Sequence, residues 1–348
     1  MKLRTIGIDL AKNVFQACGV NEHMKPQFNK RLKRHELLDF MRQQEPTMVV
    51  MEACYSSHYW GREMTKLGHN VKLIPAQHVT PFVRGNKNDP NDSFAITEAS
   101  QRPYIRFVPV KTEFQQEILC LHRIRERLIK NKGALSNQAR GLLSEFGVVF
   151  PCGHKALLNG LNGVIDNAQY SHRLQNMMID MLSEYETTLK RLKGIEQQLG
   201  IFVEGSESGR ILLSIPGIGI INASALLASI DKGQAFNNPK EFAVWLGLTP
   251  KQHASGNINK MGGITKRGDR YLRKQLVHGA RSVVSRAAKK TDSLSLWATK
   301  LRVTKPFNKV AVAMAHSMQQ FTLSRPCSIP YWTKAQSLCG CCGRQDSG

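Results

Sequence analysis

Residues 4–20 read RTIGIDLAKNVFQACGV, and this stretch decides the fold of the N-terminal part of the chain. Two runs rich in β-forming residues, 4–8 and 14–20, flank a short polar segment. This pattern predicts two antiparallel strands joined by a tight connection. A third strand is expected near residues 27–30.

Apolar runs further along predict two more strands, with helical patterns between them. Residues 47–51 and 71–74 are typical of buried strands, and residues 34–44 and 59–67 have the apolar spacing of helices. Three strands followed by alternating helix and strand predict a mixed α/β sheet. This element order fits a ribonuclease-H-like (RuvC-like) domain over residues 1–110.

Residues 111–204 are predicted to be helical, with two apolar stripes. Their members are Leu128, Leu135, Ala139, Leu142 and Phe146 in the first, and Leu174, Met178, Met181, Tyr185, Thr188, Leu192, Ile195 and Leu199 in the second. Steps of three, four and seven residues are typical of a coiled-coil seam. Pro151 and Gly153 lie between the stripes. An antiparallel pair within one chain, a dimer through the same seam and an ordinary amphipathic hairpin all fit this pattern.

Residues 205–324 are predicted to form a mainly α-helical domain that follows a flexible linker at 205–209. The tail at 325–348 differs in composition, contains Cys339, Cys341 and Cys342, and is expected to be poorly ordered. Its Cys-x-Cys-Cys spacing is not that of a structural zinc site.

The charge balance predicts a polyanionic partner. The chain has 49 Lys and Arg against 26 Asp and Glu, a formal net charge of +23, and nucleic acid is the commonest cytoplasmic polyanion. The first residues do not resemble a signal peptide, so we expect a cytoplasmic, nucleoid-associated protein whose eight cysteines form no disulfide framework. The uncharged segment 211–230 is interrupted by Pro216, Gly217 and Gly219, so no membrane span is expected.

Four acidic residues stand where catalytic carboxylates could meet. Asp9 and Glu52 each follow an apolar run, so both should lie at strand ends. Asp89 is expected to cap a helix, with Pro90 in its first position and Asp92 one turn further along. Four carboxylates repel one another unless a divalent cation is present, and oxygen ligands select Mg²⁺ or Mn²⁺. Paired hard cations of this kind support phosphodiester cleavage.

The C-terminal domain offers candidate phosphate contacts. Gly217 and Gly219 lie in a Pro-Gly-Ile-Gly turn that resembles a helix-hairpin-helix, whose backbone N–H groups can approach a phosphate. Further on, small residues alternate with cations, and the candidate nucleic-acid-binding side chains are Lys260, Lys266, Arg267, Arg270 and Arg273. Ser255 lies in this segment beside Gly256, and a serine hydroxyl can attack phosphorus when it is activated.

These motifs together resemble the DEDD transposases of bacterial insertion sequences, which are related to the Piv-type DNA invertases. The resemblance covers about residues 1–320 and rests on Asp9 in Gly-Ile-Asp-Leu-Ala-Lys, Glu52 in Met-Glu-Ala, the Asn-Asp-Pro-Asn-Asp element, the Pro-Gly-Ile-Gly turn and Ser255-Gly256. It departs at the C-terminus, where Arg325-Pro326 interrupts a segment that continues as a helix in the family.

The resemblance implies a transposase that exchanges DNA strands. It implies that Asp9, Glu52, Asp89 and Asp92 bind Mg²⁺, and that Ser255 forms a covalent phosphoserine link to DNA. It also implies a homo-oligomer, dimer or tetramer, in which the acids and the serine of one site come from different protomers. The implied partners are donor DNA, target DNA and a bridge RNA that pairs with both, so that base pairing reads the sequence.

Two other functions remain open from the residues themselves. A Holliday-junction-type endonuclease would use the acids with water as the nucleophile and would leave free ends. A non-catalytic nucleic-acid scaffold would use the same acids only as helix caps and turns. Gly-Ile-Asp also opens actin-like kinases, but we find no second glycine-rich phosphate loop in the sequence.

Overall fold

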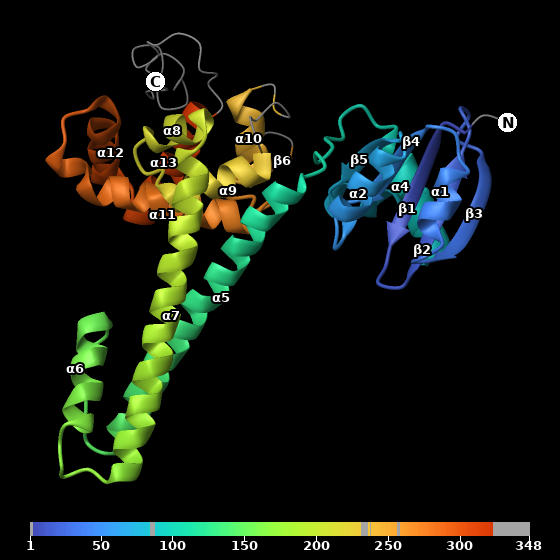
Figure 1. Ribbon diagram of the computed structural model, residues 1–348. Coiled ribbons are helices and arrows are strands. Elements are labelled where there is room, and N and C mark those ends of the chain that lie inside the picture. Colours follow the sequence, from blue (N-terminus) through green and yellow to red (C-terminus); the bar gives the residue numbers. More distant parts are fainter. Residues whose placement is uncertain (1–2, 84–87, 231–235, 237, 256–257, 323–348) are drawn as a thin grey trace, which may run out of the picture. The chain divides into compact units, whose positions relative to one another are not determined.

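The computed structural model describes residues 3–83, 88–230, 236, 238–255 and 258–322 (Figure 1). The chain divides into two compact units, Met1–Ile195 with Ala225–Ala235, and Glu196–Ser224 with Phe236–Gly348. The tail predicted at 325–348, which includes Cys339, Cys341 and Cys342, lies outside the described residues. Within the described ranges, no helix has both the length and the apolar character to cross a membrane.

The N-terminal part of the first unit is built on a five-stranded sheet in the order β3-β2-β1-β4-β5. The strands are β1 (Thr5–Leu10), β2 (Val14–Val20), β3 (Pro26–Lys33), β4 (Met48–Glu52) and β5 (Asn70–Ile74). β2 is antiparallel to both β1 and β3, whereas β1, β4 and β5 are parallel. The predicted mixed α/β sheet is therefore confirmed, and its order is consistent with the expected ribonuclease-H-like fold.

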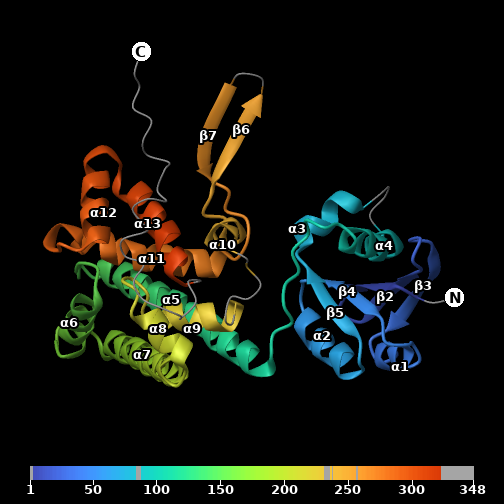
Figure 2. The same cartoon turned by 90° about the horizontal axis from the view of Figure 1, so that it is seen from above.

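Helices cover both faces of this sheet (Figure 2). They are α1 (Leu37–Arg42), α2 (Ser57–Lys66), α3 (Ala76–Val79), the 3₁₀ turn η1 (Thr80–Phe82) and α4 (Asp89–Ser100). α1 and α2 pack on the face that carries Ile8 and Phe15, and Trp60 stands edge-on to the Phe15 ring. α4 lies on the opposite face, where a Cβ on Gly7 would come within 2.7 Å of the Ser93 carbonyl oxygen. Gly7 thus lets α4 approach the middle of β1.

Three helices follow in the chain: α5 (Glu113–Ser144), α6 (His154–Ile165) and α7 (His172–Glu204). They belong to the first unit, except that the end of α7, from Glu196, belongs to the second. The predicted stripe on α7 is buried from Leu174 to Leu199, except that Met181 is half-buried. The prediction was wrong at Leu142 of α5 and at Phe146, two residues beyond the end of this helix. Their exposed fractions are 44% and 53%, while Leu143 is fully buried. An α-helix turns every 3.6 residues, so the stripe runs from Ala139 to Leu143, where it meets α6 and α7.

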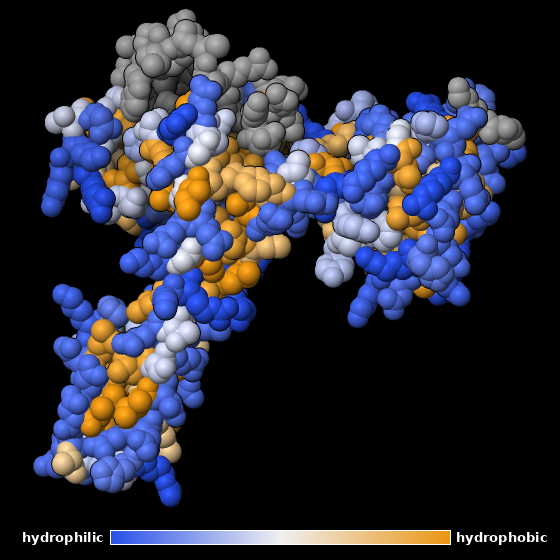
Figure 3. Space-filling view, viewed as in Figure 1, coloured by the Kyte–Doolittle hydropathy of each residue, from blue (hydrophilic) through white to orange (hydrophobic). Residues whose placement is uncertain are grey.

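Apolar side chains gather along these helices, as the orange surface in Figure 3 shows. The cluster combines Leu135, Ala139 and Leu143 of α5 with residues of both partners, namely Leu157, Leu161, Val164, Leu174, Met178 and Tyr185. Each helix therefore buries its apolar stripe against two others, and burial of apolar area is the main stabilising contribution.

The second unit is mainly α-helical, as predicted. Its elements are α8 (Glu207–Leu213), the start of α9 (Ile220–Ile230), α10 (Pro239–Leu246), β6 (Pro250–Ser255), β7 (Ile258–Ile264), α11 (Arg270–Arg286), the 3₁₀ turn η2 (Ala287–Lys289), α12 (Ser293–Thr304) and α13 (Phe307–Thr322). β6 and β7 pair as an antiparallel hairpin. This hairpin projects from the helices of its own unit (Figure 2).

Two glycines hold the base of the hairpin against the end of α10. Gly247 and Gly268 have φ of +67° and +87°, and a Cβ on Gly268 would lie 1.7 Å from the Trp245 carbonyl oxygen. The backbones on the two sides of the hairpin are thus too close for any side chain. Gly268→Ala should lower stability by about 3 kcal/mol, because it adds a left-handed φ penalty to overpacking.

Thermal unfolding of the purified protein checks this prediction. Gly263→Ala is the matched control, because a Cβ at Gly263 meets no atom within 4 Å and its φ is not left-handed. An equal melting temperature for both variants would show that the base of the hairpin is not packed in this way.

Candidate active site

Asp9 and Glu52 lie at the carboxyl ends of two neighbouring parallel strands. Ile8 of β1 is opposite Met51 of β4, so the next residues, Asp9 and Glu52, are side by side. Ile8 and Met51 both point into the core beneath α1 and α2. Because side chains alternate along a strand, both acids point to the opposite face, which α4 covers.

The first turn of α4 brings the other two acids to this face. Here the prediction was off by one residue: Asn88 is the N-cap, and its side chain accepts the N–H of Asn91 at 2.9 Å. Asp89 is the first helical residue, Pro90 the second, and Asp92 follows within the first turn. Asn and Asp cap helices equally well, and the use of Asn88 leaves the Asp89 carboxylate outside the cap.

All four acids line one open cavity of about 720 Å³. The remaining lining residues come from the β1 and β4 ends and from α3, η1 and the segment that follows: Leu10, Cys54, Ala76, Val79, Thr80 and Val83. The structure therefore brings together the four carboxylates that the sequence singled out over a span of more than eighty positions.

Burial and like charge raise the pKa of Asp9 to about 6 from an ordinary value of 3.8. Burial makes the largest contribution, followed by the negative charges of Asp92, Asp89 and Glu52, while the backbone N–H of Leu10 acts in the opposite direction. The negative charges of the acids on this face therefore repel one another. Oxygen donors that repel in this way suit a hard divalent cation, which would hold them by neutralising the repulsion.

The carboxylates share the cavity without closing around one point. Among the described residues, no three His, Cys, Asp or Glu side chains are grouped closely enough to hold one ion. Mutual repulsion favours such a spread arrangement.

The raised pKa of Asp9 predicts a pH effect on stability. The folded protein binds this proton more tightly than the unfolded chain, so the contribution is fully present below about pH 4 and is lost as pH rises through 6. In metal-free buffer, the melting temperature of the wild type relative to Asp9→Asn should therefore fall between pH 4.5 and about 7. Comparison with this variant cancels the opposite effect of His58 and His122, whose pKa values burial lowers to about 4.

A pH-independent difference between the two proteins would contradict this environment for Asp9. A second check uses a divalent cation, which should reverse the trend in the wild type and leave Asp9→Asn less affected.

Cys54 also lines this cavity, although no sequence motif marks it as a functional residue. Burial, and then the charges of Glu52 and Asp9, raise the pKa of its thiol to about 11. Its Sγ lies 3.5 Å from the Tyr55 carbonyl oxygen. The available signal was its place two residues after Glu52, just beyond the end of the strand.

Ser255 lies in the second unit, at the last position of β6. It is opposite Ile258, so only residues 256 and 257 separate the paired ends of the hairpin. The strand is exposed along its whole length, and Ser255 itself is exposed. A hydroxyl at the end of a projecting hairpin is accessible to a large substrate such as a nucleic acid.

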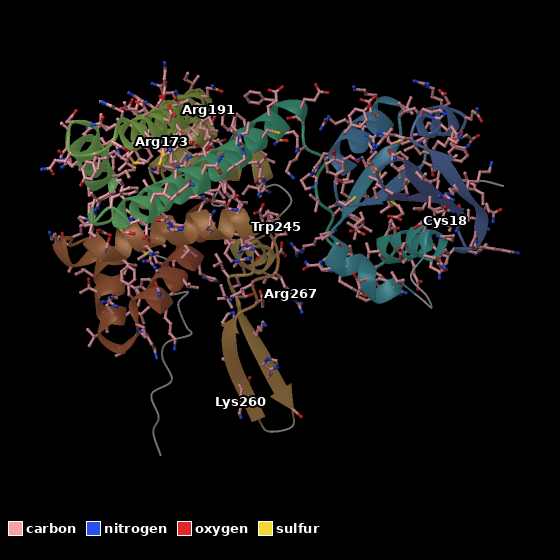
Figure 4. The ribbon with its side chains drawn as sticks, turned by 90° about the horizontal axis from the view of Figure 1, so that it is seen from below. Cys18, Arg173, Arg191, Trp245, Lys260 and Arg267 are labelled. Atoms are coloured by element: carbon pink, nitrogen blue, oxygen red, sulfur yellow. The ribbon has the colours of Figure 1, made fainter. Side chains whose placement is uncertain are left out.

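Four of the five predicted cationic contacts have exposed side chains: Lys260, Lys266, Arg267 and Arg270. Lys260 lies on the hairpin and Arg267 at its base (Figure 4). Arg273 is half-buried instead, and its guanidinium donates to the carbonyl oxygens of Leu246 and Arg267 at 2.8 and 3.1 Å. These hydrogen bonds connect α11 to the end of α10 and to the base of the hairpin.

Gly217 also has a structural reason to be glycine. Its φ is +86°, and a Cβ there would lie 2.9 Å from the carbonyl oxygen of Gly279 in α11. The Asn222 side chain donates to the Gly217 carbonyl at 3.0 Å. Gly219 is exposed, and a Cβ there would meet no atom within 4 Å. Phosphate binding by this turn stays a prediction.

Comparison with known proteins adds two family matches. Residues 6–148 match a DEDD transposase family, and residues 209–295 match the family described as "Transposase IS116/IS110/IS902 family". The first match includes Asp9, Glu52, Asp89 and Asp92, and the second includes Ser255.

Curated relatives extend this similarity over most of the chain. A probable family 20 transposase of Pseudomonas aeruginosa is 44% identical over 319 residues, which are 91% of this chain and 94% of that protein. The transposase for insertion sequence element IS1111A of Coxiella burnetii is 35% identical over 90% of this chain and 87% of its own length. A pilin gene-inverting protein of Moraxella bovis is 35% identical over 24% of this chain and 26% of its own length.

The two family matches follow one another along the chain, one over the sheet with the four acids and the other over the hairpin with the serine. Relatives above 30% identity cover both of them. The chain therefore belongs to the IS116/IS110/IS902 family of transposases, enzymes that cleave and transfer DNA strands.

Proposed function

We propose that this transposase exchanges strands of donor and target DNA through a covalent bond between Ser255 Oγ and a DNA phosphate. Asp9, Glu52, Asp89 and Asp92 would hold Mg²⁺, with Mn²⁺ as a cation of similar ligand preference. The observation that carries this proposal is the cavity that all four carboxylates line.

The reaction conserves phosphodiester bonds. Ser255 Oγ forms a bond to phosphorus, and the bond from phosphorus to one deoxyribose oxygen breaks. That oxygen leaves as a hydroxyl after taking up a proton, and the serine proton passes to water. The hydroxyl end of another strand then attacks phosphorus and loses its proton, the bond from phosphorus to Ser255 Oγ breaks, and Oγ takes up a proton. This joins the strands, and no energy-supplying cofactor is needed.

The acids and the cations of the chain have different roles in this proposal. The acids Asp9, Glu52, Asp89 and Asp92 would hold a divalent cation, whose positive charge would stabilise the negative charge that develops on the scissile phosphate. The exposed Lys260, Lys266, Arg267 and Arg270 contact phosphates and fix the position of the DNA without reading its sequence.

Sequence reading is proposed to reside in a bridge RNA that pairs with donor and target DNA. This part rests on the resemblance to bridge-RNA-guided transposases, and a net charge of +23 suits a protein that holds an RNA and two duplexes. On the same ground, we propose a dimer or tetramer as the active form.

The test is to purify the protein from cells that carry its complete insertion element, extract the bound RNA, and incubate the complex with Mg²⁺ and DNA containing the element's ends. A protein–DNA adduct that maps to Ser255 and requires a discrete RNA is the expected result. Mg²⁺-dependent free ends without an adduct would indicate a hydrolytic nuclease. Binding without cleavage would indicate a scaffold.

A further inference from the structure

Strand β3 forms an edge of the sheet, and its residues alternate between the two faces. Phe28 and Leu32 belong to the core beneath α1 and α2. Asn29, Arg31 and Lys33 therefore point to the other face, which is the face of α4 and the four acids. The side chains of Arg31 and Lys33 are exposed.

The strand register places Arg31 in the same row as Asp9. Asp9 of β1 is opposite Gln16 of β2, and Gln16 is opposite Arg31 of β3. Residues that face one another across a sheet point to the same side, and two strand spacings put the Asp9 and Arg31 Cα atoms roughly 10 Å apart. Lys33 stands two residues along β3 on this same face, opposite Val14.

Two hydrogen bonds next to this row connect β2 and β3 to the first turn of α4. Gln16 is only 6% exposed, and its side-chain amide donates to the side-chain oxygen of Asn29. Asn29 in turn donates to the carbonyl oxygen of Pro90 at 3.2 Å, in the first turn of α4. β3 is thus tied to the turn that carries Asp89 and Asp92, with a neutral side chain between Asp9 and Arg31.

Arg31 and Lys33 are not needed to balance negative side chains. Within the described part of the chain, neither makes an ion pair, and neither lines the acid cavity. Arginine binds phosphate well, because its planar guanidinium can donate two parallel hydrogen bonds to the phosphate oxygens.

We propose that Arg31, with Lys33 beside it, binds the backbone of the DNA strand whose scissile phosphate enters the acid cavity. The guanidinium holds a phosphate next to the scissile one and so sets the position of the strand along the cavity. This inference rests on the proposed function, and it assigns a nucleic-acid contact to the N-terminal domain, where none was predicted.

Protection of the sheet edge is the competing explanation for these cations, because exposed charges on an edge strand prevent pairing with other chains. Lys30 separates the two explanations. It lies on the same strand but on the opposite face, opposite Ala17, and its Nζ stands 5.4 Å from the centre of the Phe40 ring. A charged side chain on either face of β3 would protect the sheet edge. The proposed DNA contact requires a cation on the face that carries Arg31 and the four acids.

The experiment uses the complex purified from cells that carry the complete element, and DNA with one neutral methylphosphonate in place of each phosphate around the cleaved bond in turn. In the wild type, a methylphosphonate at one position beside the cleaved bond should slow cleavage roughly 10-fold, as expected for loss of a charge-assisted hydrogen bond. The Arg31→Gln variant should cleave unmodified DNA more slowly than the wild type by a similar factor. A methylphosphonate at that same position should not slow the variant further. Lys30→Gln should behave as the wild type.

Two results would overturn the inference: an Arg31→Gln variant that keeps every methylphosphonate effect, or equal losses in Arg31→Gln and Lys30→Gln. The Asp9→Asn variant, tested in parallel, distinguishes failure of the proposed function from failure of the Arg31 inference alone. If that variant cleaves normally, the acid cavity is not the catalytic site. If it is inactive while Arg31→Gln is unaffected, only the role of Arg31 is wrong.

Discussion

Replacement of Ser255 with alanine should reduce the covalent protein–DNA adduct by roughly 10³-fold or more, because the attacking oxygen is lost. The variant should keep its fold and its affinity for DNA, since Ser255 is exposed at the end of β6 and its hydroxyl fills no cavity. The adduct is measured by denaturing electrophoresis of the protein with end-labelled DNA, and affinity is measured in parallel by a mobility shift.

Ser285→Ala is the matched control, because Ser285 is an exposed serine of α11 in the same unit. An adduct that persists in Ser255→Ala would exclude this serine as the nucleophile. Cleavage to free ends with unchanged rate in Ser255→Ala would favour water as the nucleophile and hence the nuclease.

The sheet could be predicted from the sequence because its strands are local patterns. Residues 14–20 were predicted as a strand and form β2 with the same bounds. The helix expected at residues 34–44 begins only at Leu37, because Lys33 and Glu36 close a turn in which the Glu36 carboxylate accepts the Lys33 N–H at 2.7 Å. A side-chain contact of this kind decides a helix boundary, and apolar spacing does not reveal it.

The acid site could be predicted because it depends on element order. Acids that follow parallel strands meet at one edge of the sheet, so Asp9 and Glu52 were expected together. The residue that caps α4 could not be chosen in advance, since Asn88 and Asp89 have similar capping propensities.

Long-range contacts explain the remaining differences. For Arg273, a DNA contact stays a prediction, and the sequence did not reveal the hydrogen bond that this side chain donates to the carbonyl oxygen of Leu246, 27 positions away. The proposed role of Arg31 depends on the pairing of three strands, and nothing in the sequence distinguishes residue 31 from the other cations. Register and packing are properties of the folded chain, and a strand pattern alone does not fix them.

Replacement of Asp9 with asparagine should lower the rate of strand cleavage by roughly 10²- to 10³-fold, the size of effect seen when one electrostatic group is removed from a catalytic site. Asparagine keeps the shape of the side chain but removes the negative charge that Asp92, Asp89 and Glu52 oppose. The rate is measured with Mg²⁺ on DNA carrying the element's ends. Asp39→Asn is the control, because Asp39 is an exposed acid of α1 that pairs with Arg42 and lies outside the cavity.

The same substitution should not destabilise the metal-free protein, and this separates chemistry from folding. Burial and three like charges make ionised Asp9 unfavourable, so above pH 6 the neutral asparagine should give an equal or higher melting temperature. A variant that is as stable as the wild type but inactive would show that the charge of Asp9 serves strand cleavage and does not stabilise the fold. Full activity would exclude the cavity as the catalytic centre, and inactivity with a lowered melting temperature would mean that Asp9 supports the fold instead.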